Sequence, residues 1–276
     1  MTPDEYAAQQ AVISAAVATF VAKLAQLFLI PQLAPLEWIR LLEVLFPEVQ
    51  ARRQEAAELA RRFFDEERRR QRPDLPRHDT DLVPYSFDQF VRGMDPVRKV
   101  ISQAEATEKA LGALARQAVR EVENGGRRQI IQAVESDRGV RRGWARVATG
   151  RETCAWCLML ISRGPVYMSA DTAGLDLADQ TAESMIAAGE DVSDHMSEWH
   201  PGCDCKVVPV YSADWPGREA AERALELWKA ASTEAAELIR SGKARSQNFN
   251  REAINALRRR LERGDISISD YAGIAA

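Results

Sequence analysis

A chain of 276 residues with 46% hydrophobic and 28% charged residues has the composition of a soluble globular protein, long enough to bury one large core or two modest ones. Its formal net charge of −4 argues against binding nucleic acid over the whole surface and leaves local basic patches open. The N-terminus has neither a basic segment nor a small-residue cleavage site, so no secretory signal is predicted.

The first predicted element is a helix from Asp4 to Ile30, with Thr2 as its cap and Pro3 at the first helical position. Between Glu5 and the end of this helix, Lys23 is the only charged residue. The first half is only weakly hydrophobic and Lys23 interrupts the stronger second half, so we expect an amphipathic or oligomer-buried helix and no membrane span. Because so little of its surface is polar, we hypothesise that this helix docks on an oligomeric partner.

Helical patterns continue through the first 138 residues. They are a helix from about Pro35 that Pro47 breaks or kinks, a run over residues 48–72, a helix from Asp95 to Val122 that Asn124-Gly125-Gly126 stops, and a short helix over residues 127–136.

The pattern changes at Gly139, where short apolar pieces separated by Gly, Pro and Cys predict strands around turns. The predicted strands are residues 144–148, 158–161, 166–167 and 207–211, and a helix is expected over residues 175–188. Two more helices are predicted near residues 218–239 and 251–263. The predicted fold is therefore mainly α with a small α+β zinc-knuckle-like module. It divides into a helical N-terminal region (1–138), a cysteine/histidine module (139–212) and a helical C-terminal tail (213–276).

All four cysteines lie in one pair of motifs, Cys154-Ala155-Trp156-Cys157 and His200-Pro201-Gly202-Cys203-Asp204-Cys205. A C-x-x-C turn brings two thiolates to the spacing that tetrahedral zinc requires, and the second motif offers three more donors on a sharp turn. We favour Cys154, Cys157, Cys203 and either His200 or Cys205 as ligands. A structural zinc ion would link two segments more than 40 residues apart and stabilise a module whose core is small.

The four cysteines have other possible uses besides binding a structural metal. Two disulfides would need the same four residues, but cysteines confined to one motif fit a reducing compartment. A thioredoxin-like redox pair would leave the second motif unexplained. A zinc deaminase would need H-x-E with P-C-x-x-C, which the sequence lacks. Structural metal is favoured, and disulfides or plain thiols remain open.

The stretch Trp144-Ala-Arg-Val-Ala-Thr-Gly-Arg-Glu-Thr-Cys-Ala-Trp-Cys157, followed by Trp199-His-Pro-Gly-Cys-Asp-Cys-Lys-Val-Val-Pro-Val210, resembles the Mu F-like minor head proteins of tailed bacteriophages, in their actinobacteriophage form. Members of that family carry a basic strand leading into C-x-x-C, a variable insertion, and then H-P-x-C-x-C before a strand. The resemblance covers residues 140–211. It implies a minor capsid (head morphogenesis) protein that is associated with the portal and assists procapsid assembly and DNA packaging or ejection.

The same resemblance places the protein in the virion head interior, and in the host cytoplasm during assembly. The portal is the expected partner, with scaffold protein, major capsid protein and DNA as further candidates. Similar proteins of actinobacterial phages carry the label capsid maturation protease, so that activity is the alternative, and a zinc-binding adaptor without an enzymatic role is the third.

A hidden protease would need a Ser–His pair. Among the three histidines, His200 is a candidate ligand, which leaves His78 and His195. Ser193 and Ser197 lie beside His195, but sequence neighbours seldom form a nucleophile–base pair. No G-x-S-x-G motif is present. We therefore predict no catalytic residue.

Charge is unevenly placed in and before the module. Arginines gather ahead of the first cysteine motif: Arg127, Arg128, Arg138, Arg141, Arg142, Arg146 and Arg151. Acidic residues are frequent from Gly164 to Cys205, where no Lys or Arg occurs. The arginines predict a face for DNA or an acidic partner. The alternative is that the two sets of charges neutralise each other within the module.

Overall fold

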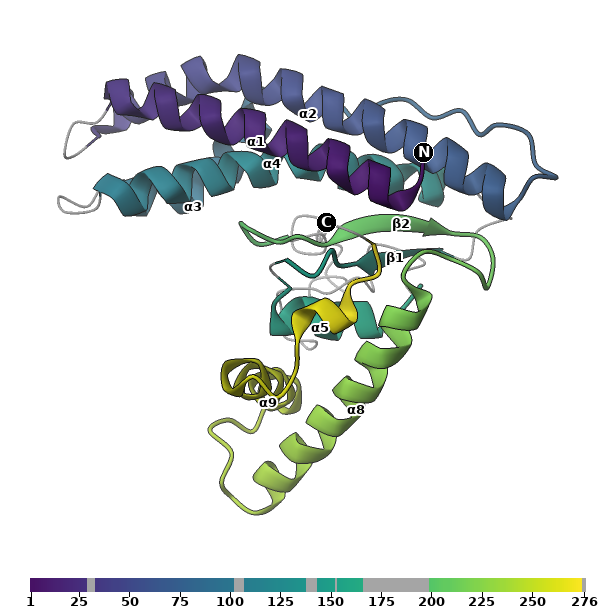
Figure 1. Cartoon of the computed structure of the whole chain (residues 1–276). Helices are drawn as coiled ribbons and strands as arrows, with labels where there is room; N and C mark the ends of the chain where they lie inside the picture. The colour runs from purple at the N-terminus through teal and green to yellow at the C-terminus, as the bar shows by residue number, and fades with distance from the viewer. Residues whose placement is uncertain (29–32, 102–106, 138–142, 152, 166–198, 275–276) are drawn as a thin grey trace, which may run out of the picture. The chain divides into compact units, whose positions relative to one another are not determined.

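The computed structural model describes residues 1–28, 33–101, 107–137, 143–151, 153–165 and 199–274 (Figure 1). The chain divides into two compact units. The first comprises Met1–Asp65, His78–Ala133 and Trp199–Gly202, and the second comprises Glu66–Arg77, Val134–Glu198 and Cys203–Ala276. The predicted fold class is confirmed, because long helices dominate and the described strands form one two-stranded sheet.

Long helices build the first unit: α1 (Pro3–Phe28), α2 (Pro35–Gln71), α3 (Phe87–Ile101) and α4 (Thr107–Ser136), although the last turns of α2 and α4 belong to the second unit. The start of α1 is a capping box. The Glu5 N–H donates to Thr2 Oγ1 at 3.1 Å, and the Thr2 N–H donates to the Glu5 carboxylate at 2.7 Å. The predicted start of the first helix is therefore confirmed.

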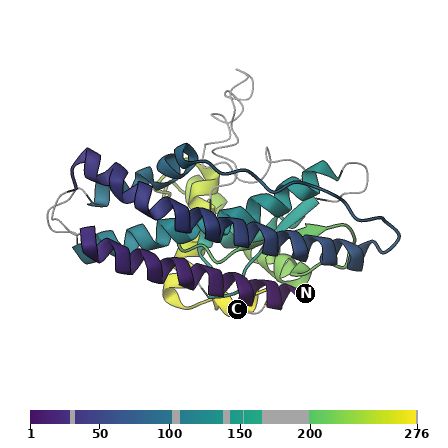
Figure 2. The same ribbon diagram turned by 90° about the horizontal axis from the view of Figure 1, so that it is seen from above.

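Helix α1 packs within its own unit, where it lies beside α2 in both views (Figures 1 and 2). Tyr6 stacks on Phe63 of α2 with ring centroids 4.5 Å apart, and Ser14 donates a hydrogen bond to Glu123 of α4 at 3.1 Å. Val17 is fully buried one further turn along. These contacts bury one side of α1 within its own unit, and its docking on an oligomeric partner stays a prediction.

Pro3–Leu24 is long and apolar enough to cross a membrane by length and composition, with a mean hydropathy of 1.3. Core helices of soluble proteins pass the same test. Tyr6, Ile13, Val17 and Val21 of this helix are buried inside the first unit, and 28% of the apolar window is buried.

Gly125 and Gly126 lie inside α4 and do not end it, which corrects the prediction of a helix stop. A Cβ on Gly125 would lie 2.5 Å from the Arg53 carbonyl oxygen, and one on Gly126 would lie 3.2 Å from the Ala56 carbonyl oxygen. The glycines therefore let the backbones of α2 and α4 approach closely. Packing outweighs the low helix propensity of glycine, which costs about 1 kcal/mol per residue relative to alanine.

Two prolines also lie inside helices. Pro47 stands within α2, which continues from Pro35 to Gln71, so a break at Pro47 is wrong and the alternative, a kink, stays a prediction. Pro96 stands within α3, which begins at Phe87 rather than at Asp95. In the helix predicted from Asp95 to Val122, residues 95–101 belong to α3 and residues 107–122 to α4, and residues 102–106 lie outside the described residues.

The second unit contains β1 (Gly143–Val147), α5 (Ala155–Ser162), β2 (Lys206–Val210), α8 (Arg218–Arg240), α9 (Phe249–Arg263) and the short 3-10 helix η2 (Ile268–Tyr271). The strands pair antiparallel, with Gly143 opposite Val210 and Val147 opposite Lys206. These strands and the two late helices confirm their predictions to within about two residues, the usual uncertainty of such boundaries.

The strand predicted over residues 158–161 is wrong, because these residues form part of α5. The strand predicted over residues 166–167 and the helix over residues 175–188 lie outside the described residues. The cysteine-bearing elements and the C-terminal helices, predicted as separate regions at residues 139–212 and 213–276, fall in one compact unit.

Helix α5 is apolar on all sides and lies in the core of the second unit, as such a helix must. It packs against α8 and α9, which contribute Ala231 and Leu257 to the same cluster. The cluster consists of Ala155, Leu158, Met159, Leu160, Ala231, Ile254, Ala256 and Leu257. The C-terminal helices therefore support the element that carries the first cysteine motif.

The last turn of α2 is tied to the sheet of the second unit by Gln71. Its side-chain carbonyl accepts from the backbone N–H of Tyr211 at 2.7 Å and of Ser212 at 3.0 Å, and its amide donates to the Pro209 carbonyl at 2.9 Å. The side chain thus satisfies one backbone group in β2 and two just beyond its end, as a neighbouring strand would.

Candidate functional site: a cluster of four thiols

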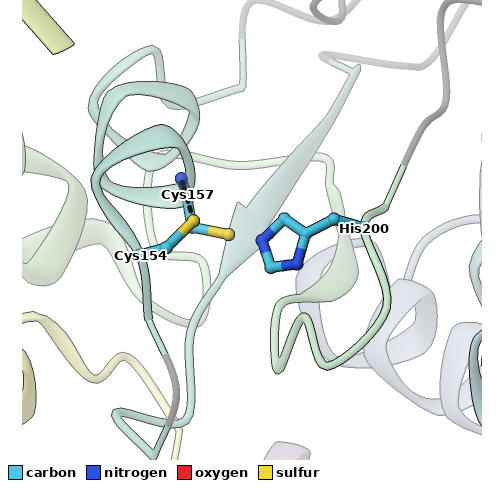
Figure 3. A group of neighbouring side chains, drawn as sticks. All are labelled: Cys154, Cys157 and His200. Atoms are coloured by element: carbon cyan, nitrogen blue, oxygen red, sulfur yellow. Dashed lines mark hydrogen bonds between the residues drawn. The ribbon is translucent and has the colours of Figure 1, made fainter. Parts of the chain in front are cut away.

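The first cysteine motif forms the start of α5. Cys154 is the N-cap, with extended backbone, and its sulfur accepts a hydrogen bond from the Cys157 N–H at 3.4 Å. The Leu158 N–H donates to the Cys154 carbonyl at 3.0 Å, which closes the first turn. Figure 3 shows both cysteine side chains at this turn. The helical turn therefore supplies the geometry that the C-x-x-C spacing predicts.

The second motif leads directly into β2. Gly202 has a φ of 84°, in the left-handed region that favours glycine, and the chain turns there before Cys203. Cys205 immediately precedes Lys206, the first residue of β2. Since β2 pairs with β1, and the chain continues from β1 to α5, the sheet brings the four cysteines together within the second unit.

Three of the four sulfur atoms form one compact group, and that of Cys154 lies beside Cys157. The sulfurs of Cys157, Cys203 and Cys205 all lie within 4.8 Å of one another, and those of Cys157 and Cys203 are 3.3 Å apart. The same three residues are buried, whereas Cys154 is partly exposed. Four thiolates around tetrahedral zinc stand about 3.8 Å apart. The group is therefore positioned to hold a metal ion, and its sulfur donors fit a thiophilic one.

The cysteines are thiols, not disulfides. Hydrogen bonding with Cys154, Cys203 and Cys205, together with burial, raises the pKa of Cys157 well above its usual value. The hydrogen bond with Cys157 lowers the pKa of Cys205, but contact with Cys203 and burial raise it overall. The thiols of Cys157 and Cys205 are therefore neutral at pH 7 until a cation displaces their protons.

Asp204, between the two cysteines of the second motif, binds the approach to the first motif. Its carboxylate accepts from the hydroxyl of Thr149 at 2.9 Å, from the Arg151 backbone N–H at 3.1 Å, and from the hydroxyl of Thr153 at 3.3 Å. Sequence reasoning missed this residue. The sequence shows that Asp204 lies between two cysteines, but it does not indicate which three groups donate hydrogen bonds to it.

His200, the fifth candidate ligand, lies on the turn that precedes Cys203 (Figure 3). Its ring Nδ1 is 3.2 Å from the Pro201 carbonyl oxygen. The stretch from Trp199 to Gly202 belongs to the first unit, where the Trp199 carbonyl accepts from Arg120 and the Trp199 ring lies 5.1 Å from the Arg127 guanidinium. The four cysteines, in contrast, all belong to the second unit.

The arginines predicted to meet DNA or a partner differ in their surroundings. Arg127 is 1% exposed and donates to Glu123 at 2.8 Å, and Arg146 in β1 is also 1% exposed. Arg151 is exposed and Arg128 is partly exposed. Arg138, Arg141 and Arg142 lie outside the described residues. Burial removes the first two from any surface that contacts a partner.

The histidines weighed for a protease are not brought together with a serine by the described residues. The ring of His78 packs edge-on against Phe64 with centroids 6.3 Å apart, and its carbonyl accepts from Arg61. Ser193, His195 and Ser197 lie outside the described residues.

Comparison with known proteins identifies phage relatives. Residues 1–231 match the profile of the family described as VG15 protein. The chain is 53% identical over 271 residues to the Gene 15 protein of Mycobacterium phage D29, covering 94% of this chain and 98% of that protein. It is 51% identical over 291 residues to the Gene 15 protein of Mycobacterium phage L5, covering 99% of each. No solved structure matches. The expected origin in a phage protein family is therefore confirmed.

Proposed function

Since the chain belongs to the VG15 protein family, whose relatives above are phage proteins, we propose that it is a minor head protein that assists procapsid assembly at the portal. The supporting observation is the thiol cluster. The two cysteine motifs that carry the resemblance to Mu F-like head proteins are brought together by one antiparallel strand pair.

We propose zinc as the metal and Cys154, Cys157, Cys203 and Cys205 as its ligands. Four sulfur donors suit zinc better than calcium or magnesium, which prefer oxygen. The role of the ion is structural, because four protein ligands leave no position open for a substrate. It would hold α5 against the start of β2, two segments far apart in sequence.

Elemental analysis of protein purified under reducing conditions tests the ligand set. We expect about one zinc per wild-type chain, because tetrahedral sites take four protein ligands. Cys205→Ser should lose the ion, and His200→Asn should retain it. If His200→Asn loses the zinc ion and Cys205→Ser retains it, the fourth ligand is His200 and not Cys205. Absence of metal from the reduced wild-type protein would refute the zinc site.

The function itself is tested in a phage from which the gene has been deleted and resupplied from a plasmid. We expect the deletion to lower the yield of filled heads, and the wild-type gene to restore it. Cys203→Ser should fail to restore it, whereas Ser241→Ala, at an exposed helix end, should restore it fully. Normal heads without the gene would contradict an assembly role.

A protease role makes a different prediction in the same system. His78→Ala should leave processing of the major capsid protein unchanged, because the His78 ring packs on Phe64. The same result is expected for His195→Ala. Loss of processing with either variant, while heads still assemble, would favour the maturation protease.

A further inference from the structure

From the contacts of Asp204, which are independent of the sulfur atoms, we infer that this residue positions the thiol site: its carboxylate holds the segment that enters α5, so that Cys154 and Cys157 face Cys203 and Cys205. This inference deepens the proposed zinc site and rests on it for its effect on metal affinity.

The first argument is the convergence of donors on one carboxylate. Two hydroxyls and one backbone N–H, from Thr149, Thr153 and Arg151, bind Asp204 at 2.9 to 3.3 Å. Thr149 is 9% exposed and Thr153 is 3% exposed, so water competes little for the two hydroxyl bonds, whereas the bond from the Arg151 N–H is exposed. Hydrogen bonds to an ionised acceptor are about twice as strong as those between neutral groups.

The second argument is where these donors lie in the chain. They occupy the connection from β1 to Cys154, and Thr153 directly precedes that cysteine. Asp204 directly follows Cys203 and precedes Cys205. Each bond therefore links the segment that leads into the first cysteine pair with the residue between Cys203 and Cys205, so a displacement of this segment would separate the sulfurs.

The path of the connection supports the same role. Gly150 has a φ of 81°, which turns the chain so that residues on both sides of it reach one carboxylate. A Cβ on Gly150 would lie 3.0 Å from the Ala272 Cβ, and the Gly273 N–H donates to the Ala148 carbonyl at 3.0 Å. The C-terminal residues thus support this segment, and Asp204 binds it through its own donors.

Electrostatics excludes a simpler role for Asp204 as a counter-charge. A divalent ion held by four thiolates has a net charge of about −2, so another carboxylate beside it is repelled. The carboxylate is tolerated because three donors compensate its charge. Its favourable contribution must therefore come from its hydrogen bonds, which restrain the segment.

The experiment compares Asp204→Asn with the double variant Thr149→Val/Thr153→Val. The asparagine is isosteric but turns an N–H group toward at least one of the donors. The valines remove two donors and leave the charge. Asp214→Asn is the matched control, because Asp214 is an exposed carboxylate of the same unit that pairs with Arg70. Zinc affinity is measured on the full chain by competition with a chelator.

We expect zinc binding to weaken about 10- to 100-fold in Asp204→Asn, as is typical when residues that orient metal ligands are changed. The valine variant should weaken it in the same direction and to a smaller extent. Asp214→Asn should bind within about twofold of the wild type. Wild-type affinity in both the asparagine and the valine variants would overturn the inference.

Hydrogen exchange of the Arg151 amide in metal-free protein separates this inference from the zinc proposal. The amide donates to Asp204 at 3.1 Å, so it should be protected in the wild type and exchange faster in Asp204→Asn. If the wild type binds no zinc but this difference is found, the zinc proposal fails and the positioning role stands. Equal exchange in the two proteins would refute the positioning role, whatever the metal content.

Discussion

Replacing Gln71 by alanine should destabilise the second unit, although the residue lies at the end of a long helix and far in sequence from the sheet. Gln71 is 9% exposed, and its side-chain amide makes three hydrogen bonds, of 2.7, 2.9 and 3.0 Å, with backbone groups in and just after β2. At about 0.5 to 1.5 kcal/mol for each bond, their loss should cost about 2 to 4 kcal/mol.

Gln54→Ala is the matched control. Gln54 lies on an exposed face of the same helix, and its amide bonds Glu58 one turn away at 2.9 Å. This change should alter the free energy of unfolding by less than about 0.5 kcal/mol.

Urea unfolding followed by tryptophan fluorescence measures both variants, because Trp144 and Trp215 are buried in the second unit. A Gln71→Ala midpoint equal to that of Gln54→Ala would refute the reasoning that Gln71 serves as a partner for the sheet.

Three further changes test other parts of the structure. Gly125→Ala should destabilise the first unit by about 1 to 3 kcal/mol, because the new Cβ would lie 2.5 Å from the Arg53 carbonyl oxygen. Gly112→Ala in the same helix is the control: its Cβ would meet only the flexible end of Arg116 at 3.1 Å, so the change should be neutral or stabilising. Thermal unfolding compares the two variants, and equal effects would contradict the close approach of α2 and α4. Deleting residues 1–34 should yield insoluble or unfolded protein, because it removes Tyr6 from Phe63; a soluble, monodisperse product in size-exclusion chromatography would show that α1 is not part of the core. Burial alone would raise the pKa of Glu234, but Arg259 and Arg260, at 2.6 and 2.9 Å, lower it overall, so this carboxylate stabilises the fold above its ordinary pKa of 4.5 and loses that effect as the pH falls through the lowered value. Glu234→Gln should therefore cost about 0.5 to 1 kcal/mol of unfolding free energy at pH 7 and nothing once the carboxylate is protonated. A cost that did not change on acidification would contradict the ion pair.

The sequence predicted those parts of the fold that local signals determine. Both strands and both C-terminal helices lie where periodicity and turn residues place them. The C-x-x-C spacing likewise predicted a turn, and Cys154 caps a helix there. The apolar run Leu158–Ile161 was misjudged as a strand because a short buried helix and a short buried strand look alike in sequence.

Other errors came from contacts between distant residues. Gly125 and Gly126 predict a helix stop from sequence alone, but in the structure they lie inside α4 where the backbone of α2 approaches closely. The arginine cluster predicts that Arg127 lies on a basic surface, but Arg127 is buried and pairs with Glu123. The roles of Gln71 and Asp204 depend on residues that the chain brings to them only on folding.

The match to the family profile ends at residue 231, within α8, but the core of the second unit includes residues beyond that point. Ile254 and Leu257 of α9 pack in the same cluster as Leu158 and Leu160 of α5. The D29 and L5 relatives match almost the whole chain, in agreement with a C-terminal segment that supports the cysteine-bearing helix.

The most direct test of the proposed function is the amount of this protein in procapsids, measured by quantitative mass spectrometry. Procapsids from an infection with a functional portal gene should contain the protein, and those formed without the portal should lack it. Procapsids that contain the portal but none of this protein would contradict the assignment to the head. Equal amounts with and without the portal would contradict the portal as its partner.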